Sequence, residues 1–167
     1  AEKLLSIPNP VDSEKIKATA REAAPIAVDG PFIMSAGRLV KVKNFDVLIR
    51  AFAAAGGGRK LVIAGEGEER GALEALAREL GVADRVILPG FIGNPYPLMA
   101  AADIFILSSE SEGYPNALIE GMAVGRPVIS TNCDSGPSEI LAEKRRHAIS
   151  GITFAEHGVL VPVGDDE

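Results

Sequence analysis

The chain has 167 residues, of which 47% are apolar, and this is enough to bury the core of one ordinary domain. Its formal net charge of -6 excludes broad nucleic-acid binding, because neutralising phosphates needs a basic face that this composition does not supply. One cysteine, Cys133, excludes an internal disulfide, and with only two histidines the sequence predicts no metal site.

Short apolar runs alternate along the chain with longer amphipathic runs, a pattern typical of parallel strands joined by helical crossovers. The segments expected to form strands are residues 32–36, 60–64, 85–88, 104–107, 127–130 and 158–161. The segments expected to form helices are residues 44–55, 68–80, 95–102, 115–124 and 138–144. The predicted fold class is therefore α/β, a Rossmann-like three-layer domain in which helices flank a parallel sheet.

Residues 142–156 are expected to form an exposed insertion before the last strand. Its cluster Lys144-Arg145-Arg146 indicates solvated surface in preference to an anionic partner site, and His147 and His157 are also interpreted as surface residues.

In open parallel sheets, ligands bind outside the carboxyl ends of the strands. The loops that follow residues 36, 64, 88, 107 and 130 are therefore expected to line one crevice.

The loop after the first strand carries two cations, Arg38 and Lys43, around the start of the helix predicted at residues 44–55. Helix N-termini favour anions, and a guanidinium fork with a lysine point charge adds affinity for a diphosphate. In the alternative, one cation pairs with a carboxylate and the other is solvated. These residues alone leave both readings open.

The loop after residue 107 leads into a helix and carries two carboxylates. Glu112 lies in the loop and Glu120 lies eight positions on, so the two can contact different parts of one extended ligand. A carboxylate accepts hydrogen bonds from neighbouring hydroxyls, as in a sugar or a ribose. Gly113 allows close approach of the backbone, and Pro115 suits a first helical turn.

The stretch Glu112-Gly113-Tyr114-Pro115-Asn116-Ala117-Leu118-Ile119-Glu120 resembles the Glu-x7-Glu signature of retaining glycosyltransferases with the GT-B fold, of the group 1 or family 4 type. Gly37-Arg38 with Lys43 is similar to the family's diphosphate-binding segment, and Gly65-Glu66-Gly67 to its second strand turn. The resemblance covers about residues 7–165. Asn44 and Ser135 depart from it, since glycine is common at both places.

The resemblance implies the C-terminal, donor-binding domain of such an enzyme. Residues 1–12 would be a remnant of the interdomain linker, and residues 13–167 the nucleotide-sugar-binding domain, truncated before its final helices. The acceptor would be held by an N-terminal domain, so the fragment alone is expected to be inactive. The donor would be a UDP- or GDP-sugar, used without metal or cofactor in carbohydrate biosynthesis.

By the same resemblance, Arg38 and Lys43 would bind the diphosphate, Glu120 the ribose hydroxyls, and Glu112 would be the catalytic residue beside the transferred sugar. The backbone of Gly113, Tyr114, Pro115 and Asn116 would assist. Leu118 and Phe91 would border the ribose and base, with Gly37 and Gly65 in the adjoining turns. Glu112 would stabilise an oxocarbenium-like state during front-face attack.

No segment has the character of a membrane span or of a signal peptide. The longest apolar stretch, residues 99–107, is interrupted by Asp103 and is shorter than the ~20 residues that a span requires. We expect a cytoplasmic protein, with peripheral membrane contact or a glycolipid acceptor left open.

Three alternatives remain. A nicotinamide-binding oxidoreductase is disfavoured because Glu66, Glu68 and Glu69 crowd the glycine turn with negative charge. A sugar-nucleotide epimerase fits the segment 113–120 less well than a transferase does. A non-catalytic nucleotide-sugar-binding or scaffold domain of the same fold is the main alternative, because fold alone does not establish function.

Overall fold

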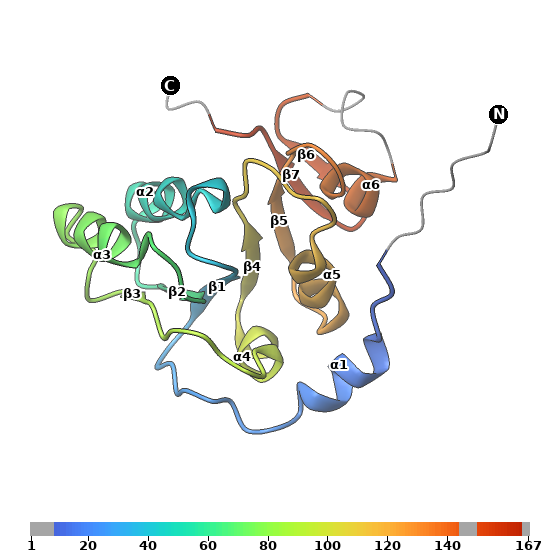
Figure 1. Cartoon of the computed structure of the whole chain (residues 1–167), viewed down its shortest axis with the longest axis horizontal. Coiled ribbons are helices and arrows are strands. Elements are labelled where there is room, and N and C mark those ends of the chain that lie inside the picture. The colour runs from blue at the N-terminus through green and yellow to red at the C-terminus, as the bar shows by residue number, and fades with distance from the viewer. Residues whose placement is uncertain (1–8, 144–149, 165–167) are drawn as a thin grey trace.

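The computed structural model describes residues 9–143 and 150–164, built around a seven-stranded sheet in the order β3-β2-β1-β4-β5-β7-β6 (Figure 1). The strands are β1 Phe32–Ala36, β2 Lys60–Ala64, β3 Val86–Ile87, β4 Ile104–Leu107, β5 Val128–Thr131, β6 Thr153–Ala155 and β7 Gly158–Val161. All neighbours pair in parallel except β6, which runs antiparallel to β7. The predicted α/β class is confirmed.

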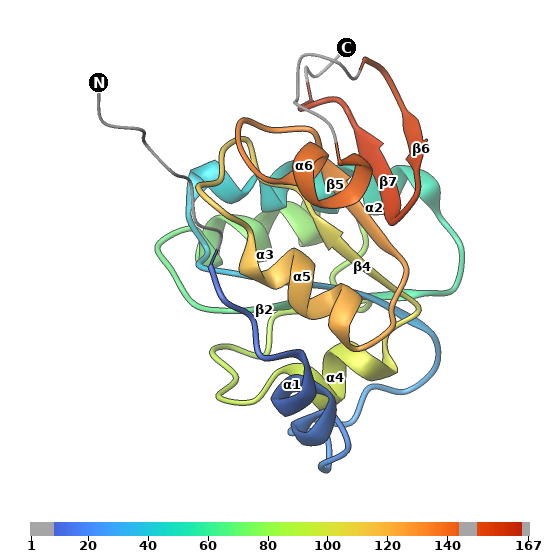
Figure 2. The same cartoon turned by 90° about the vertical axis from the view of Figure 1, so that its right-hand side faces the viewer.

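Helices cover both faces of the sheet and make the three layers expected from the sequence. On one face lie α2 (Phe45–Ala55) and α3 (Arg70–Glu79). On the other lie α4 (Tyr96–Ala101), α5 (Asn116–Ala123) and α6 (Pro137–Ala142). The short α1 (Ser13–Thr19) packs outside α4 and α5, as Figures 1 and 2 show.

The strands are apolar throughout because both of their faces are buried. In β2, Val62 faces the layer of α4 and α5, whereas Leu61 and Ile63 face the layer of α2 and α3. All three side chains are fully buried. A strand in the middle of such a sheet therefore reads as a continuous apolar run.

Three elements were not predicted: α1, β6 and the 3-10 turn Lys41–Lys43. In α1 only Ile16 is buried, so the helix has no apolar stripe to reveal it. Strand β6 falls inside residues 142–156, where the sequence predicted an exposed insertion; residues 150–152 are exposed as expected, but residues 153–155 pair with β7 and belong to the sheet. Three residues are too short for a period-two pattern, and Phe154 in their middle is 85% exposed.

The remaining elements match their predicted positions to within one or two residues. The largest differences are at α3, predicted at 68–80, and at α6, which begins at Pro137 and ends at Ala142 instead of spanning 138–144. The cluster Lys144-Arg145-Arg146, His147 and the first eight residues of the expected linker lie outside the described residues.

The order of the strands places a crevice at the carboxyl ends of β1 and β4. These strands are neighbours, yet the chain leaves β1 toward β2 and β3 on one side and continues from β4 toward β5 on the other. Ligands of open α/β sheets bind at such a switch point. A ligand site is therefore expected at the loops after β1 and β4.

Candidate donor-binding site

Hydrogen bonds join the loop after β1 to the loop after β4. The hydroxyl of Ser108 donates to the carbonyl oxygen of Lys43 over 2.7 Å, and the amide of Glu110 donates to the carbonyl oxygen of Val42 over 2.9 Å. Lys43 ends a short 3-10 turn that leads into α2. The two loops thus form one continuous rim above the sheet.

An ion pair across this rim connects two of the predicted site residues. Lys43 Nζ lies 2.6 Å from Glu112 Oε1, and the two side chains are 23% and 11% exposed. The hydroxyl of Ser109 donates to the same oxygen over 2.6 Å. The structure therefore brings together the carboxylate that was predicted to be catalytic and one cation of the expected clamp.

Arg38 differs from Lys43 in that its side chain is exposed and, within residues 9–143 and 150–164, makes no ion pair. One cation is paired with a carboxylate and the other is solvated, which is the arrangement that the sequence offered as the alternative to a diphosphate clamp. The two readings are compatible, because a lysine paired with a carboxylate at a crevice can exchange that partner for a phosphate.

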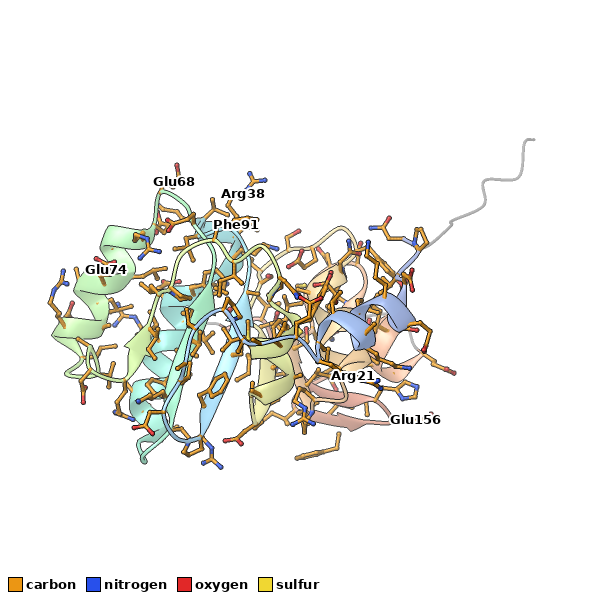
Figure 3. All side chains as sticks on the ribbon, turned by 90° about the horizontal axis from the view of Figure 1, so that it is seen from below. Arg21, Arg38, Glu68, Glu74, Phe91 and Glu156 are labelled. Atoms are coloured by element: carbon orange, nitrogen blue, oxygen red, sulfur yellow. The ribbon has the colours of Figure 1, made fainter. Side chains whose placement is uncertain are left out.

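Arg38 borders a cavity of about 380 Å³ together with three other predicted residues, Gly37, Gly65 and Phe91. The remaining lining residues are Ala36, Ala64, Glu66, Ile92 and Pro95. Figure 3 shows Arg38 and Phe91 at the same edge of the molecule, where both border this cavity. Phe91 is 81% exposed, so an apolar ring stands free at the mouth of the cavity.

Two strand-end turns that contribute residues to the cavity lining are in backbone contact with each other. A Cβ added to Gly65 would collide with the carbonyl oxygen of Gly37, and one added to Gly67 would collide with the carbonyl oxygen of Leu39. The amides of Gly37 and Leu39 in turn donate to Ala64 and Glu66. This close approach of the backbones is sufficient to explain both glycines of the Gly65-Glu66-Gly67 turn, so they do not by themselves indicate a cofactor site.

The negative charge of that turn is compensated by Arg70, a residue that sequence reasoning missed. Its guanidinium lies 2.7 Å from Glu66 Oε1 and 2.9 Å from Oε2, and it also contacts Glu74 at 3.1 Å. The hydrogen bond from Arg70 lowers the pKa of Glu66, and the carboxylate raises the pKa of Arg70. The spacing of four residues between each pair was the available signal.

The second carboxylate of the signature, Glu120, is half-buried on α5. The hydroxyl of Tyr96 on α4 donates to Glu120 Oε1 over 3.3 Å. Burial raises the pKa of Glu120, and burial together with the neighbouring Glu120 charge raises that of Tyr96. Tyr96 was not predicted, since contact across 24 positions between two helices leaves no local pattern.

The other predicted residues of this segment have different surroundings. Gly113 and Asn116 are exposed, Tyr114 is half-buried, and Pro115 is buried beside Gly136. The amide of Asn116 already donates to the carbonyl oxygen of Tyr114. Leu118 is fully buried in the core, so its side chain does not line the crevice as expected for a contact with ribose or base.

Asn44 and Ser135, the two departures from the family pattern, both have left-handed backbone, with φ of 48° and 63°. Glycine adopts this conformation without strain, and asparagine tolerates it better than most residues. The positive φ values give a backbone reason for the glycines that the resemblance led us to expect at these places, and the chain keeps both turns without them.

In the part of the chain that the structure describes, no three His, Cys, Asp or Glu side chains lie where they could hold a metal ion. Within the same part, no helix has the length and apolar character needed to cross a bilayer.

The family described as Glycosyl transferases group 1 matches residues 16–167. The N-acetylgalactosamine-N,N'-diacetylbacillosaminyl-diphospho-undecaprenol 4-alpha-N-acetylgalactosaminyltransferase of Campylobacter jejuni is 39% identical over 158 residues. These cover 95% of this chain and 40% of that enzyme, so the chain spans less than half of its relative.

Solved structures agree with the fold. The lipopolysaccharide outer core galactosyltransferase WaaB is 32% identical with a TM-score of 0.63, over 70% of this chain and 35% of that protein. HepE of Anabaena in complex with UDP is 26% identical with a TM-score of 0.61, over 68% of this chain and 32% of that protein.

Proposed function

The chain belongs to the group 1 family of glycosyl transferases, and we propose that it is the donor-binding domain of a retaining enzyme that uses a UDP-sugar. The observation that carries the proposal is the ion pair of 2.6 Å between Lys43 and Glu112 at the switch point, beside the cavity lined by Arg38 and Phe91. A cation for phosphate and a carboxylate for sugar hydroxyls are thus adjacent.

The diphosphate would lie between Arg38 and Lys43. Arg38 is exposed at the cavity and free to turn toward a ligand, and Lys43 stands at the beginning of α2, where the helix macrodipole also favours an anion. Two cations at this place would stabilise the charge that develops on the departing nucleotide. They supply what a divalent cation supplies in other transferases, so we infer that the domain needs no metal.

The nucleoside would occupy the cavity of about 380 Å³, where the exposed ring of Phe91 is available for stacking. Glu120 would bind the ribose hydroxyls, with Tyr96 donating to its Oε1. UDP is favoured as the nucleotide because HepE, which shares the fold, is solved with UDP bound. Glu112 would face the transferred sugar and support its oxocarbenium-like state electrostatically.

The acceptor would be bound by another domain. The chain spans 40% of the Campylobacter relative, and the acceptor of that enzyme is named as a diphospho-undecaprenol glycolipid. We infer that this chain works in glycolipid or polysaccharide synthesis at the cytoplasmic face of a membrane, without crossing it. The chain by itself would then bind the donor and transfer nothing.

Calorimetric titration of the chain with UDP, GDP and ADP, with and without EDTA, tests the proposal. UDP should bind without metal, and Arg38→Ala or Lys43→Ala should weaken binding by about ten-fold or more, since hydrogen bonds to charged groups are strong. Arg59→Ala is the matched control, because Arg59 pairs with Asp103 at the opposite ends of the strands. Loss of UDP binding on adding EDTA, or equal affinities of all variants, would refute the proposal.

A further inference from the structure

The Glu112 carboxylate receives two donors on the same oxygen. Lys43 Nζ and Ser109 Oγ each lie 2.6 Å from Oε1, and among the described residues none donates to Oε2. The two donors differ in what they do when a ligand arrives. Lys43 is a cation that a diphosphate attracts, whereas the Ser109 hydroxyl is neutral and has no such competitor.

Ser109 is fixed independently of any ligand. It is 1% exposed at the carboxyl end of β4, and its carbonyl oxygen accepts a hydrogen bond of 2.5 Å from the hydroxyl of Thr131 on β5. The preceding residue, Ser108, is held through the carbonyl oxygen of Lys43. A buried hydroxyl on a strand end whose backbone is tied to its neighbours is a preorganised donor.

We propose that Ser109 is the positioning residue of Glu112. Its hydroxyl holds Oε1 whether or not Lys43 remains paired, and it thereby directs Oε2 toward a hydroxyl of the donor sugar. This inference rests on the proposed function, because it requires that Lys43 be drawn toward a diphosphate. At that moment the carboxylate loses its ion pair, and Ser109 keeps it from turning into solvent.

Lys43 and Ser109 would therefore contribute to the binding of different parts of the donor. Lys43 contributes to binding any nucleoside diphosphate, whereas Ser109 contributes only to the additional affinity that the sugar provides. A serine that acted only through the stability of the fold would alter both affinities together. The ratio of UDP-sugar affinity to UDP affinity therefore separates the positioning role from a structural one.

The test compares Ser109→Ala and Ser109→Thr with Ser35→Ala. Ser35 is a matched control because it is fully buried and its hydroxyl also donates over 2.6 Å, but to the carbonyl oxygen of Ile106 in place of Glu112. Calorimetry measures the affinity of each protein for UDP and for UDP-glucose, UDP-galactose and their N-acetyl derivatives. Ser109→Ala should lower the affinity ratio for the best sugar by about ten-fold. Ser109→Thr should restore the ratio, and Ser35→Ala should leave it unchanged.

A second measurement needs no ligand. The carboxyl-carbon resonance of Glu112, observed by 13C NMR, should move in Ser109→Ala and stay in place in Ser35→Ala. An unchanged resonance and an unchanged ratio in Ser109→Ala would overturn the inference, as would a wild-type chain that binds no UDP-sugar more tightly than UDP. If instead Arg38→Ala and Lys43→Ala leave UDP binding intact while the resonance still moves, the proposed function fails and the hold of Ser109 on Glu112 stands.

Discussion

Lys43 Nζ and Glu112 Oε1, from loops 69 positions apart in the sequence, lie 2.6 Å from each other at the carboxyl ends of neighbouring strands. The pair means that the proposed diphosphate site and the proposed sugar site are electrostatically coupled. A negative ligand near Lys43 must compete with a carboxylate, and it also experiences the repulsion of that carboxylate.

The first prediction concerns that competition. Glu112→Gln removes the charge and keeps the shape, so we expect UDP to bind about three-fold more tightly than to wild type, in line with the modest strength of partly exposed ion pairs. The additional affinity contributed by the sugar should fall at the same time. Titrations with UDP and with the best UDP-sugar measure both effects. Weaker binding of UDP by Glu112→Gln would contradict the competition.

The second prediction concerns the backbone contact under the cavity. Gly65→Ala forces a Cβ into the carbonyl group of Gly37, so the free energy of unfolding should fall by roughly 2 kcal/mol or more. Gly71→Ala is the control, because Gly71 lies in α3 with open space around it, and alanine there should stabilise the helix by up to about 0.5 kcal/mol. Urea denaturation measures both. Equal stability of the two variants would show that the turns can separate.

The third prediction concerns pH and Glu120. Its pKa is raised by burial above the ordinary value of 4.5, so the folded chain binds this proton more readily than the unfolded chain. Its contribution to stability is therefore full below 4.5 and is lost as the pH rises through the raised pKa. As the pH rises through the raised pKa, the Tm of Glu120→Gln should therefore increase relative to that of wild type. Tyr96→Phe removes a hydrogen bond that lowers the pKa of Glu120, so the loss of stability with rising pH should be larger in this variant than in wild type. A constant Tm difference between wild type and Glu120→Gln would disagree with the burial.

The fourth prediction concerns Arg70, which lowers the pKa of Glu66 below its ordinary value of 4.5. The stability that this pair contributes is present above 4.5 and is lost as the pH falls through the lowered pKa. Arg70→Met should therefore have a lower Tm than wild type at neutral pH, and the difference should shrink in acid. Arg50→Met, an exposed change on α2, is the control. A Tm difference between Arg70→Met and wild type that grows in acid would contradict a lowered pKa of Glu66.

Arg70→Met should also weaken UDP binding, because Glu66 lines the proposed nucleoside cavity and would carry an uncompensated charge. Calorimetry beside Arg50→Met checks this. An unchanged affinity would place Glu66 too far from the diphosphate to matter.

The sequence predicted those parts of the molecule that local patterns determine. Continuous apolar runs identified the buried strands, and the carboxyl-end rule brought Gly37, Arg38, Gly65 and Phe91 to one cavity. The sequence did not predict which partner each charged side chain contacts in the structure. The pairing of Lys43 with Glu112 depends on two loops meeting in space, and the composition of each loop is equally compatible with a solvated lysine.

The directions in which side chains point from their helices were also not predicted from the sequence. The family resemblance implied that Leu118 borders the ribose and base, but its place on α5 turns its side chain into the core. Tyr96 was not predicted as a site residue, because its hydroxyl reaches Glu120 from a different helix. Both outcomes follow from how helices pack on the sheet, which the order of residues along one helix does not reveal.

The two loops at the switch point are fastened through carbonyl oxygens of Val42 and Lys43, and neither carbonyl depends on the side chain of its own residue. Position 42 can therefore vary from one homologue to the next without loosening the rim, whereas Ser108 supplies the hydroxyl and is constrained. Laboratory selection for a folded, ligand-binding chain should accordingly accept many residues at position 42 and few at position 108.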